Sequence, residues 1–304
     1  MPVVAILLAT KDGDRFLGEQ LASYERQTMS NWELHVSDDG SSDRSVLIVQ
    51  DFARSQSRKV AWRDGPRQGF FRNYMSLALD ESIVADFFAF SDQDDIWKEE
   101  KLDRAMKWLV SVPADVPAVY FSRTELIDVN GRHLGYSPLF AHDPSFQNAL
   151  VQNIGGGNTM VFNLAARRLL MDWGAVEAIS HDWWLYQIVM GVGGAAHYDP
   201  VALVQYRQHD NNVVGSNAGW QSRLTRLLMM IGGRVRRWNA VNLKALKACE
   251  KKLSLDSQET LRHFRKAREE IWPLRPYHLC KSGVYRQSTV DNIGMYLAAI
   301  FKRI

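Results

Sequence analysis

The 304-residue chain has few cysteines and no long apolar run. Its two cysteines, Cys249 and Cys280, exclude a disulfide framework and lack metal-ligand spacing, so we expect a reducing, cytoplasmic setting. No stretch reaches the ~18 consecutive apolar residues of a membrane-spanning helix. The apolar start follows only Met1-Pro2 and has no basic segment, which favours a first strand over a signal peptide. Internal repeats and low-complexity segments are also missing.

Charge is unevenly distributed along the chain, although the net charge is only +3. Residues 217–304 carry 18 Lys and Arg against 6 Asp and Glu, a net charge of +12, whereas the other 216 residues have a net charge of −9. With 46% hydrophobic residues, the chain is long enough to bury one sizeable core plus an appendage. We therefore divide it into a domain over 1–216 and a basic C-terminal region over 217–304.

Apolar runs alternate with segments of helical spacing through the first third of the chain. The pattern predicts strands over 3–10, 32–36, 59–62 and 86–90. It predicts helices over 16–24, 46–52 and 71–79. This alternation is typical of a doubly wound α/β fold with right-handed crossovers. We expect a Rossmann-like, mostly parallel sheet flanked by helices, with a helical C-terminal appendage.

An acidic cluster follows the strand predicted over 86–90, in Ser91-Asp92-Gln93-Asp94-Asp95-Ile96-Trp97. The carboxyl end of a strand in an open α/β sheet is where ligands bind. Its three carboxylates repel one another unless a positive charge lies among them, and a divalent cation shared with substrate phosphates meets that need. The alternative is the acidic start of a helix, because Asp is a good N-cap.

A second acidic cluster follows the strand predicted over 32–36, in Ser37-Asp38-Asp39-Gly40-Ser41-Ser42-Asp43. Its Gly, Ser and Asp residues indicate a turn and the start of a helix. Both clusters are thus predicted at the same edge of the sheet.

Six features of the chain follow one another in order: Thr10, Gln20-Leu21, Gln27-Thr28, Trp32-Glu33-Leu34 and the two acidic clusters. Their order and spacing resemble those of bacterial family 2 glycosyltransferases, which have the GT-A fold. Later segments resemble the rhamnosyltransferase-like subgroup: 155–163, 181–185 and 206–215. The resemblance covers about residues 2–215. It implies a GT-A catalytic domain over 1–216, with a nucleotide-sugar half of about 1–110 and an acceptor half of about 111–216.

The resemblance implies that the cluster at 37–43 binds the base of the donor. Asp39 would accept the N3–H of uracil or thymine and Asp38 would support the turn, whereas cytosine is disfavoured because its N3 is itself an acceptor. The alternative for Asp39 is a helix cap. Thr10 and Lys11 would border the nucleotide. Many relatives have an aromatic residue and Asn at the positions of Lys11 and Asp12, so here the Lys11 ammonium would meet phosphate instead of a ring stacking on the base.

The segment Gly69-Phe70-Phe71-Arg72-Asn73 resembles the family's Gly-x-x-x-Asn segment before a helix. Gly69 would let the backbone approach the donor, and Arg72 with the helix start would offer positive potential to a diphosphate. Asn73 completes the motif. The alternative is a plain junction between a loop and a helix.

The resemblance also implies a metal site. Asp94 would contact Mn²⁺ or Mg²⁺ directly, and Asp92 would contact the metal through water or bind the ribose hydroxyls, since both ions prefer oxygen ligands. His209 would add a ligand, as similar His residues do in some relatives. The alternative is a loop His bonded to backbone. Asp210 stands where the subgroup commonly has Gly.

Asp182, in His181-Asp182-Trp183-Trp184, resembles the catalytic base of the family. One carboxylate within hydrogen-bond reach suffices to take the proton of an attacking hydroxyl. The alternative is that Asp182 is the N-cap of its own helix. His181 would orient the base. Residues assigned to the acceptor side are Trp97, Gly156, Gly157, Trp183 and Trp184, of which the tryptophans offer flat apolar faces to a sugar.

The expected function is metal-dependent, inverting transfer of a sugar from a dTDP- or UDP-sugar, with dTDP-L-rhamnose first, onto a bacterial surface glycan such as lipopolysaccharide or a lipid-linked oligosaccharide. An inactive nucleotide-sugar-binding or scaffolding protein on the same fold is the alternative, and a glycoside hydrolase is a weaker third. The basic tail has Leu224, Leu227, Leu228 and Ile231 among arginines and closes with the apolar and basic segment 295–303, which together predict contact with the inner leaflet of the membrane. Helices that pack on the catalytic domain would give the same pattern, and no nucleic-acid partner is expected.

Overall fold

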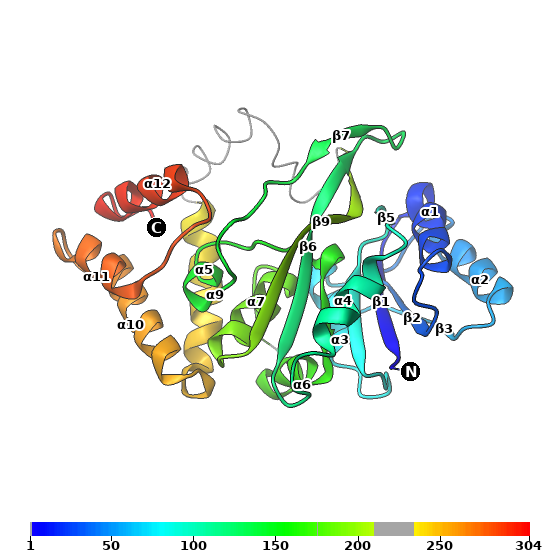
Figure 1. Cartoon of the computed structure of the whole chain (residues 1–304), viewed down its shortest axis with the longest axis horizontal. Coiled ribbons are helices and arrows are strands. Elements are labelled where there is room, and N and C mark those ends of the chain that lie inside the picture. Colours follow the sequence, from blue (N-terminus) through cyan, green and yellow to red (C-terminus); the bar gives the residue numbers. More distant parts are fainter. Residues whose placement is uncertain (1, 175, 210–233) are drawn as a thin grey trace.

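The computed structural model describes residues 2–174, 176–209 and 234–304 (Figure 1). A twisted sheet runs through the middle of the chain, helices cover both of its faces, and the C-terminal helices stand at one end. The predicted boundary at 216/217 and the predicted amphipathic segment around Leu224 and Ile231 lie outside the described residues.

The predicted strands and helices of the first third are confirmed, with ends that shift by at most three residues. The strands are β1 (Val4–Thr10), β2 (Trp32–Asp38), β3 (Val60–Asp64), β4 (Phe87–Ser91), β5 (Ile96–Trp97), β6 (Ala118–Ile127), β7 (His133–Tyr136), β8 (Val161–Asn163) and β9 (Ala195–Arg207). The helices of the first half are α1 (Asp14–Glu25), α2 (Ser45–Ser55), α3 (Phe70–Ala78) and α4 (Lys101–Leu109). Those of the second half are α5 (Phe146–Ala149), α6 (Leu164–Trp173), α7 (His181–Gly191), α9 (Arg234–Ala248), α10 (Leu255–Glu269), α11 (Leu274–Ser282) and α12 (Thr289–Ile300).

The sheet has the strand order β3-β2-β1-β4-β8-β6-β9-β5, and β7 pairs with β6 outside that path. β3, β2, β1 and β4 are parallel, as the alternation of strands and helices predicts. β8 is antiparallel to both β4 and β6, and β5 is antiparallel to β9. β6 and β9 are parallel to each other. The sheet is therefore mixed but mostly parallel, because only the short strands β5, β7 and β8 run against the others.

β1 is buried along its whole length and feeds two hydrophobic cores. Ala5 and Leu7 belong to the core on the side of α3, α6 and α7. Ile6 and Leu8 belong to the core on the side of α1, α2 and α4. Because successive side chains of a strand point to opposite faces, this one apolar run supports both helical layers.

The C-terminal helices extend the core on the α7 side. Leu261 and Phe264 of α10 and Leu279 of α11 are fully buried in that same core. The backbone N–H of Ser254 donates to the carbonyl of Gly191 at the end of α7, at 2.9 Å. The C-terminal helices thus pack on the same side of the sheet as α7. Among the described residues, no helix combines the length and apolar character needed to cross a bilayer.

The carboxyl ends of β1, β2 and β4 meet at one edge of the sheet. Thr10 is the register partner of Asp38, and Leu8 is the partner of Ser91. Both predicted acidic clusters therefore begin at the same edge, as ligand-binding sites of open parallel sheets do.

Arg167 of α6 holds the end of α3 from inside the protein. It is 3% exposed, and its guanidinium donates to the carbonyls of Ala78 at 2.9 Å, Ile83 at 2.5 Å and Asp80. The guanidinium also lies 4.4 Å from the centroid of the Phe88 ring. Carbonyls at the end of a helix lack intrahelical partners. The Arg167 side chain satisfies the last carbonyl of α3, that of Ala78, and two carbonyls in the loop that follows.

We predict that Arg167→Ala destabilises the fold by about 3 kcal/mol, because it removes a charge-assisted set of hydrogen bonds and leaves buried carbonyls unpaired. The neighbouring Arg168 is exposed, so Arg168→Ala is the matched control and should change the free energy of unfolding by less than about 0.5 kcal/mol. Urea denaturation measures both values. Equal values for the two variants would contradict this role of Arg167.

Candidate active site

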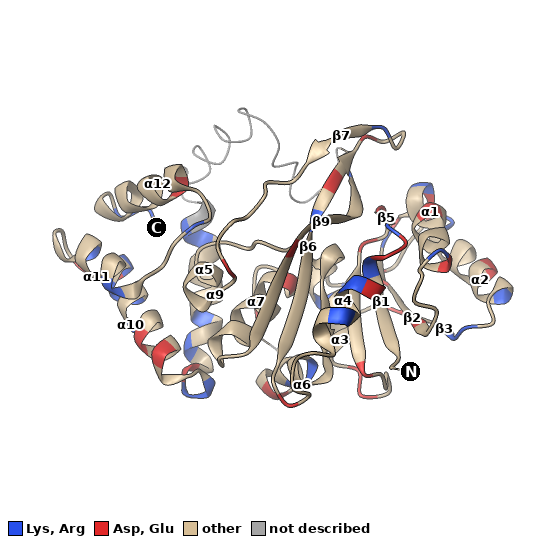
Figure 2. Ribbon diagram, in the orientation of Figure 1, with Lys and Arg blue, Asp and Glu red and all other residues tan. Residues whose placement is uncertain are grey.

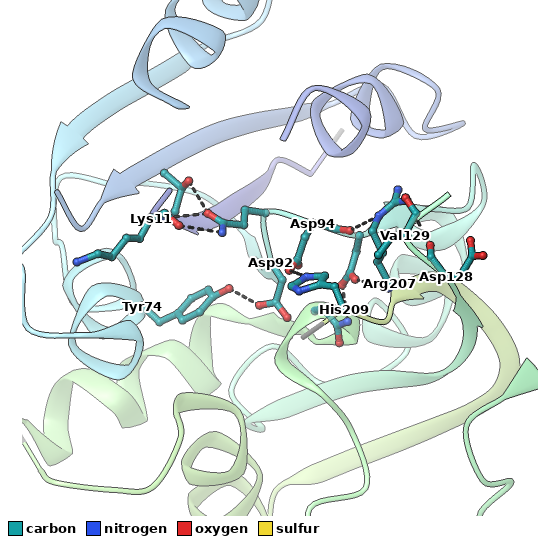
Figure 3. Close-up of polar contacts among 12 residues, drawn as sticks. Lys11, Tyr74, Asp92, Asp94, Asp128, Val129, Arg207 and His209 are labelled. Carbon is teal, nitrogen blue, oxygen red and sulfur yellow. Dashed lines mark hydrogen bonds and ion pairs between the residues drawn. The ribbon is translucent and has the colours of Figure 1, made fainter. Parts of the chain in front are cut away.

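The loop between β4 and β5 brings together the side chains of Asp92, Asp94 and Asp95 (Figure 3). Each offers one carboxylate oxygen, and these oxygens lie within 4.8 Å of one another. The predicted acid cluster is therefore a cluster in space, and helix capping does not account for it, since α4 begins only at Lys101.

Asp95 is the structural member of the three. It is fully buried, one oxygen accepts from Asn158 Nδ2 at 2.5 Å, and the other accepts from the backbone N–H of Arg207 at 3.2 Å. Burial, with the nearby charges of Asp94 and Asp92, raises the pKa of the Asp95 carboxyl well above its ordinary value. Asp92 and Asp94 are thus left to face a ligand.

Asp92 is held by Tyr74 of α3, whose hydroxyl donates to Asp92 Oδ1 and contacts the carbonyl of Ser91 at 2.7 Å. Burial and then the charge of Asp94 raise the pKa of the Asp92 carboxyl to about 7, and Asp182 adds to the shift. A carboxylate whose charge is disfavoured in this way is stabilised by a nearby cation.

Asp94 contacts the predicted third ligand. Its Oδ2 lies 2.8 Å from His209 Nε2, and the His209 ring stacks on Phe16 with centroids 5.6 Å apart. The structure thus brings His209 to the acid cluster across 115 residues of sequence.

The three predicted ligands fit a divalent cation. Asp92 and Asp94 each place one oxygen in the 4.8 Å cluster, whose third member is Asp95, and His209 contacts Asp94 Oδ2 beside it. Carboxylates with one imidazole suit Mn²⁺ and Mg²⁺. We infer that Asp92 and Asp94 would hold such an ion, with His209 beside them.

Arg207, at the end of β9, anchors the whole loop. The side chain is 1% exposed, and its Nε donates to the carbonyl of Asp94 at 3.1 Å. One terminal nitrogen lies 3.2 Å from the carbonyl of Val129, and the other is 2.7 Å from Glu19 Oε2. Sequence reasoning assigned no role to Arg207. The only signal was its place in the motif that also supplies His209.

Asp39 has the geometry expected of a base acceptor. It is 3% exposed, and its Oδ2 accepts from the backbone N–H of Gly69 at 2.8 Å. Its Oδ1 is buried and has no hydrogen-bond partner among the described residues. A buried carboxylate oxygen without a donor is costly, so it is a natural place for a ligand N–H.

Asp38 supports the turn, as predicted. Its Oδ2 accepts from the backbone N–H groups of Gly40 at 3.2 Å and Ser41 at 2.8 Å. The Ser41 hydroxyl donates to the other oxygen at 2.5 Å. These bonds occupy both oxygens, so Asp38 acts on the donor site through the shape of the turn.

Gln93, in the loop after β4, bonds to Thr10 and Lys11 at the end of β1, and sequence reasoning missed this residue. Its Oε1 accepts from Thr10 Oγ1 at 2.7 Å and from the Lys11 N–H at 2.8 Å, and its Nε2 donates to the Lys11 carbonyl at 3.0 Å. A Cβ added to Gly13 would lie 2.4 Å from Gln93, so glycine makes room for this contact. The Lys11 side chain is exposed and points away from the acid cluster (Figure 3).

The residues of segment 69–73, at the start of α3, lie in different environments. Gly69 has φ 86° and ψ 170°, a backbone that favours glycine, and it bonds Asp39. Arg72 is half-buried and lies 4.0 Å from Glu177. Asn73 is 2% exposed and donates to the carbonyls of Ser37 at 2.9 Å and Thr10 at 3.5 Å. The Asn73 amide thus ties β1 to β2, and its assignment to the donor site stays a prediction.

Asp182 lies in the first turn of α7, where its carboxylate is held from two sides. Its Oδ2 accepts from Asn153 Nδ2 at 2.9 Å and from the Gly157 N–H at 3.0 Å, and its Oδ1 accepts from the Trp183 N–H at 2.7 Å. The N-cap of α7 is Ser180, so Asp182 is not the cap of its helix. Asn153 is a further residue that the sequence did not indicate.

The His181 side chain precedes Asp182 in the chain but does not form a hydrogen bond with the Asp182 carboxylate. Its ring stacks on Tyr74 with centroids 3.7 Å apart, and neither ring nitrogen has a hydrogen-bond partner among the described residues. Burial lowers the pKa of the His181 imidazole to about 4, so the ring is neutral at pH 7. The expectation that His181 orients Asp182 is wrong, and Asn153 occupies that role.

The tryptophans assigned to the acceptor are core residues. Trp184 is fully buried, and Trp97 is 1% exposed beneath the Lys101 ammonium, which lies 3.6 Å from the ring centroid. Trp183 is 6% exposed and donates its indole N–H to the Ala149 carbonyl at 2.7 Å. The prediction that these rings stack on a sugar is wrong, because their faces are buried inside the protein.

The glycines before β8 serve close packing. A Cβ on Gly157 would lie 2.4 Å from His181 Nε2, and one on Gly155 would lie 2.5 Å from the Phe121 ring. Gly157 is buried, so its contribution is the N–H to Asp182 and not open contact with an acceptor. Gly156 is exposed, and its assignment to the acceptor stays a prediction.

The fold and the carboxylates at its edge define a GT-A glycosyltransferase. The chain belongs to glycosyl transferase family 2, whose sequence model matches residues 6–169. It is similar to the dTDP-rhamnosyl transferase RfbG of Shigella flexneri, with 27% identity over 235 residues that cover 72% of this chain and 78% of the relative. It is also similar to WfgD of Escherichia coli, described as UDP-Glc:alpha-D-GlcNAc-diphosphoundecaprenol beta-1,3-glucosyltransferase, with 30% identity over 108 residues that cover 36% of this chain and 41% of the relative.

Solved structures support the fold. The S. aureus TarS 1–349 complex with UDP-GlcNAc superimposes with a TM-score of 0.56 at 15% identity, and covers 98% of this chain and 81% of that one. The mannosyltransferase PcManGT of Pyrobaculum calidifontis, in complex with GDP-Man and Mn²⁺, gives a TM-score of 0.53 at 16% identity, over 96% of this chain and 87% of that one. The expected family and fold class are confirmed.

We predict that Asp94→Ala abolishes turnover and weakens nucleoside-diphosphate binding in Mn²⁺ or Mg²⁺, because it removes the carboxylate that faces both Asp92 and His209. Release of nucleoside diphosphate and titration calorimetry measure the two effects. Asp103→Ala, on the outer side of α4, is the control and should keep both values. Full wild-type activity in EDTA would contradict metal dependence.

We predict that Asp182→Asn slows transfer by at least about 10²-fold, the lower range for general-base catalysis, while donor affinity stays close to wild type. The amide keeps the shape of the side chain and loses its basicity. Since the amide has a single acceptor oxygen for the donors around it, the melting temperature is measured alongside. Near-normal turnover by a folded Asn variant would refute the assignment.

Proposed function

We propose that the chain is a metal-dependent inverting rhamnosyltransferase that moves L-rhamnose from dTDP-L-rhamnose onto a bacterial cell-surface glycan. The observation that carries the proposal is the unpartnered, buried Oδ1 of Asp39 at the same sheet edge as Asp92 and Asp94. An acceptor oxygen in that position suits the N3–H of thymine or uracil. The likeness to RfbG supports dTDP-rhamnose over other donors.

The chain's own residues divide the work of the reaction. Asp39 orients the base, and Gln93 keeps Thr10 and the acid cluster at a fixed separation. A divalent ion, when bound by Asp92 and Asp94, would offset the negative charge of the leaving diphosphate. The proposed donor half of the site is therefore assembled from the ends of β1, β2 and β4.

Asp182 takes the proton of the acceptor hydroxyl as that oxygen attacks the anomeric carbon. The new glycosidic bond forms on the face opposite the breaking sugar–phosphate bond, and the nucleoside diphosphate leaves with the electron pair. Inversion of the β-linked donor gives an α-L-rhamnoside. Asn153 and Gly157 hold Oδ2 of the base in place, and Asp182 lies close enough to Asp92 to raise the pKa of that carboxyl.

We propose lipopolysaccharide or a lipid-linked oligosaccharide as the acceptor, presented at the inner face of the cytoplasmic membrane. The diphosphoundecaprenol-linked acceptor in the name of WfgD supports this class. The basic C-terminal region, with a net charge of +12 over residues 217–304, would hold the enzyme near anionic lipid.

An inactive nucleotide-sugar-binding protein is the second candidate. The observation against it is that Asp92, Asp94 and Asp182 are all present, and each is oriented by specific hydrogen bonds. A protein that only binds the donor has no use for an oriented carboxylate on the acceptor side.

We predict that dTDP and UDP, with Mn²⁺, raise the melting temperature more than GDP or CMP does, and that dTDP-L-rhamnose supports the fastest turnover in a panel of sugar nucleotides. Asp39→Asn should weaken dTDP binding by at least about tenfold, because an amide is a poorer acceptor than a carboxylate for the imide N–H. Stabilisation by GDP- or CMP-sugars alone would overturn the proposed donor.

A further inference from the structure

We infer that the outward face of α12, with the apolar residues that lead into α11, is the surface that docks on an anionic lipid bilayer. We call this set the docking face: Ile271, Trp272, Leu274, Tyr277, Val290, Ile293, Tyr296, Leu297 and Phe301. The inference rests on the proposed function only in that a lipid-linked acceptor requires such a docking, and it names the surface that would carry it.

α12 is apolar on its exposed side as well as on its buried side, unlike an ordinary surface helix. Its solvent side carries Val290, Ile293, Leu297 and Phe301, which are 76%, 58%, 52% and 71% exposed. Its fully buried residues are only Met295 and Ala299. A helix of a soluble domain normally turns its larger apolar residues inward. The spacing of three to four residues puts the exposed apolar side chains in one stripe.

The residues before and within α11 extend the apolar surface. Trp272 is 63% exposed, Leu274 is 42% exposed and Tyr277 is 54% exposed. Arg275 Nη1 donates to the carbonyl of Ile300 at 3.0 Å, which places the start of α11 beside the end of α12. These exposed apolar side chains thus lie on two adjoining segments, and exposed apolar surface of this kind marks interaction sites.

Charge around the docking face is basic on balance, with Glu269 and Glu270 directly before Ile271 as acidic neighbours. Residues 271–304 contain five Lys and Arg against one acidic residue, Asp291. Lys281, Lys302 and Arg303 are exposed, and Figure 2 shows little acidic colour on α11 and α12. Apolar and aromatic side chains with a basic border are what an interfacial helix presents to anionic headgroups.

The same charges argue against a second copy of the chain as the occupant. A two-fold interface places the same patch on both subunits, so the basic borders of two docking faces would meet each other. Like charges brought together in this way repel, whereas an anionic bilayer offers both the hydrocarbon and the negative charge. The bilayer is therefore the partner that the surface fits.

Vesicle flotation of the full chain tests the inference, with phosphatidylcholine vesicles compared with vesicles that contain about one-third phosphatidylglycerol. We expect binding to the anionic vesicles, with a part that survives high salt. Ile293→Ser, Leu297→Ser and Phe301→Ser together should lower the partition coefficient at least about tenfold and remove the salt-resistant part. Lys281→Gln with Lys302→Gln should weaken binding chiefly at low salt.

A matched control uses equally exposed apolar residues of the catalytic half: Leu47→Ser, Val84→Ser and Leu139→Ser, whose wild-type side chains are 55%, 79% and 58% exposed. This variant should bind vesicles as the wild type does. Equal binding by the two triple variants would overturn the inference. So would a wild-type dimer that dissociates in the α12 variant, measured by light scattering, because the face would then join two copies.

The readouts separate this inference from the proposed function. Thermal stabilisation by dTDP with Mn²⁺ should be the same in the wild type and in all three variants, since none of the substituted residues lies at the acid cluster. Vesicle binding without dTDP stabilisation would support the docking face and contradict the proposed donor. Stabilisation by dTDP without vesicle binding would support the proposed donor and contradict the docking face.

Discussion

Mutual repulsion among three carboxylates in four residues is the constraint on which the site depends. At the end of β4, Asp92, Asp94 and Asp95 have oxygens within 4.8 Å of one another. Such a cluster holds together only if each charge is neutralised or balanced. The protein treats the three differently. Asp95 is buried among donors, Asp92 is hydrogen-bonded by Tyr74, and Asp94 meets His209. The pair that remains turned toward the ligand is the pair that a divalent cation would balance.

The groups that restrain this cluster come from distant parts of the chain and tie the two halves of the domain together. Arg207 reaches back from β9 to the Asp94 carbonyl and across to Glu19. Tyr74 bonds Asp92 with its hydroxyl and stacks its ring on His181, the residue before Asp182. These contacts connect the loop that carries Asp92 to the helix that carries the proposed base.

The sequence carried enough information to predict the strand ends and the acids that follow them. The apolar runs before Asp39 and Asp92 identify the strands, and parallel strands bring their carboxyl ends to one edge. The partners of those acids could not be predicted. Gln93 contacts Thr10 across 83 residues, and Arg207 contacts the Asp94 carbonyl across 113. Contacts at such separations depend on the register of the folded sheet.

One kind of error has a physical cause. Trp97 and Trp184 were assigned to the acceptor because an aromatic ring near a site can stack on a sugar, but the same ring gains more by burial in the core. The mostly parallel sheet was predicted correctly, but the antiparallel strands β5, β7 and β8 have two to four residues each, too few to show a period. The closing segment 295–303 was part of the predicted membrane-binding tail, but which of its side chains face outward appears only once the packing of α12 is known.

The central claim is that one edge of the sheet holds a divalent cation between Asp92 and Asp94 and a pyrimidine base against Asp39. A crystal structure with Mn²⁺ and dTDP, with anomalous diffraction used to locate the metal, tests it most directly. The account predicts an anomalous peak in contact with Asp94 and thymine N3 within hydrogen-bond distance of Asp39 Oδ1. A manganese peak away from both carboxylates, or a base that leaves Asp39 Oδ1 without a partner, would contradict it.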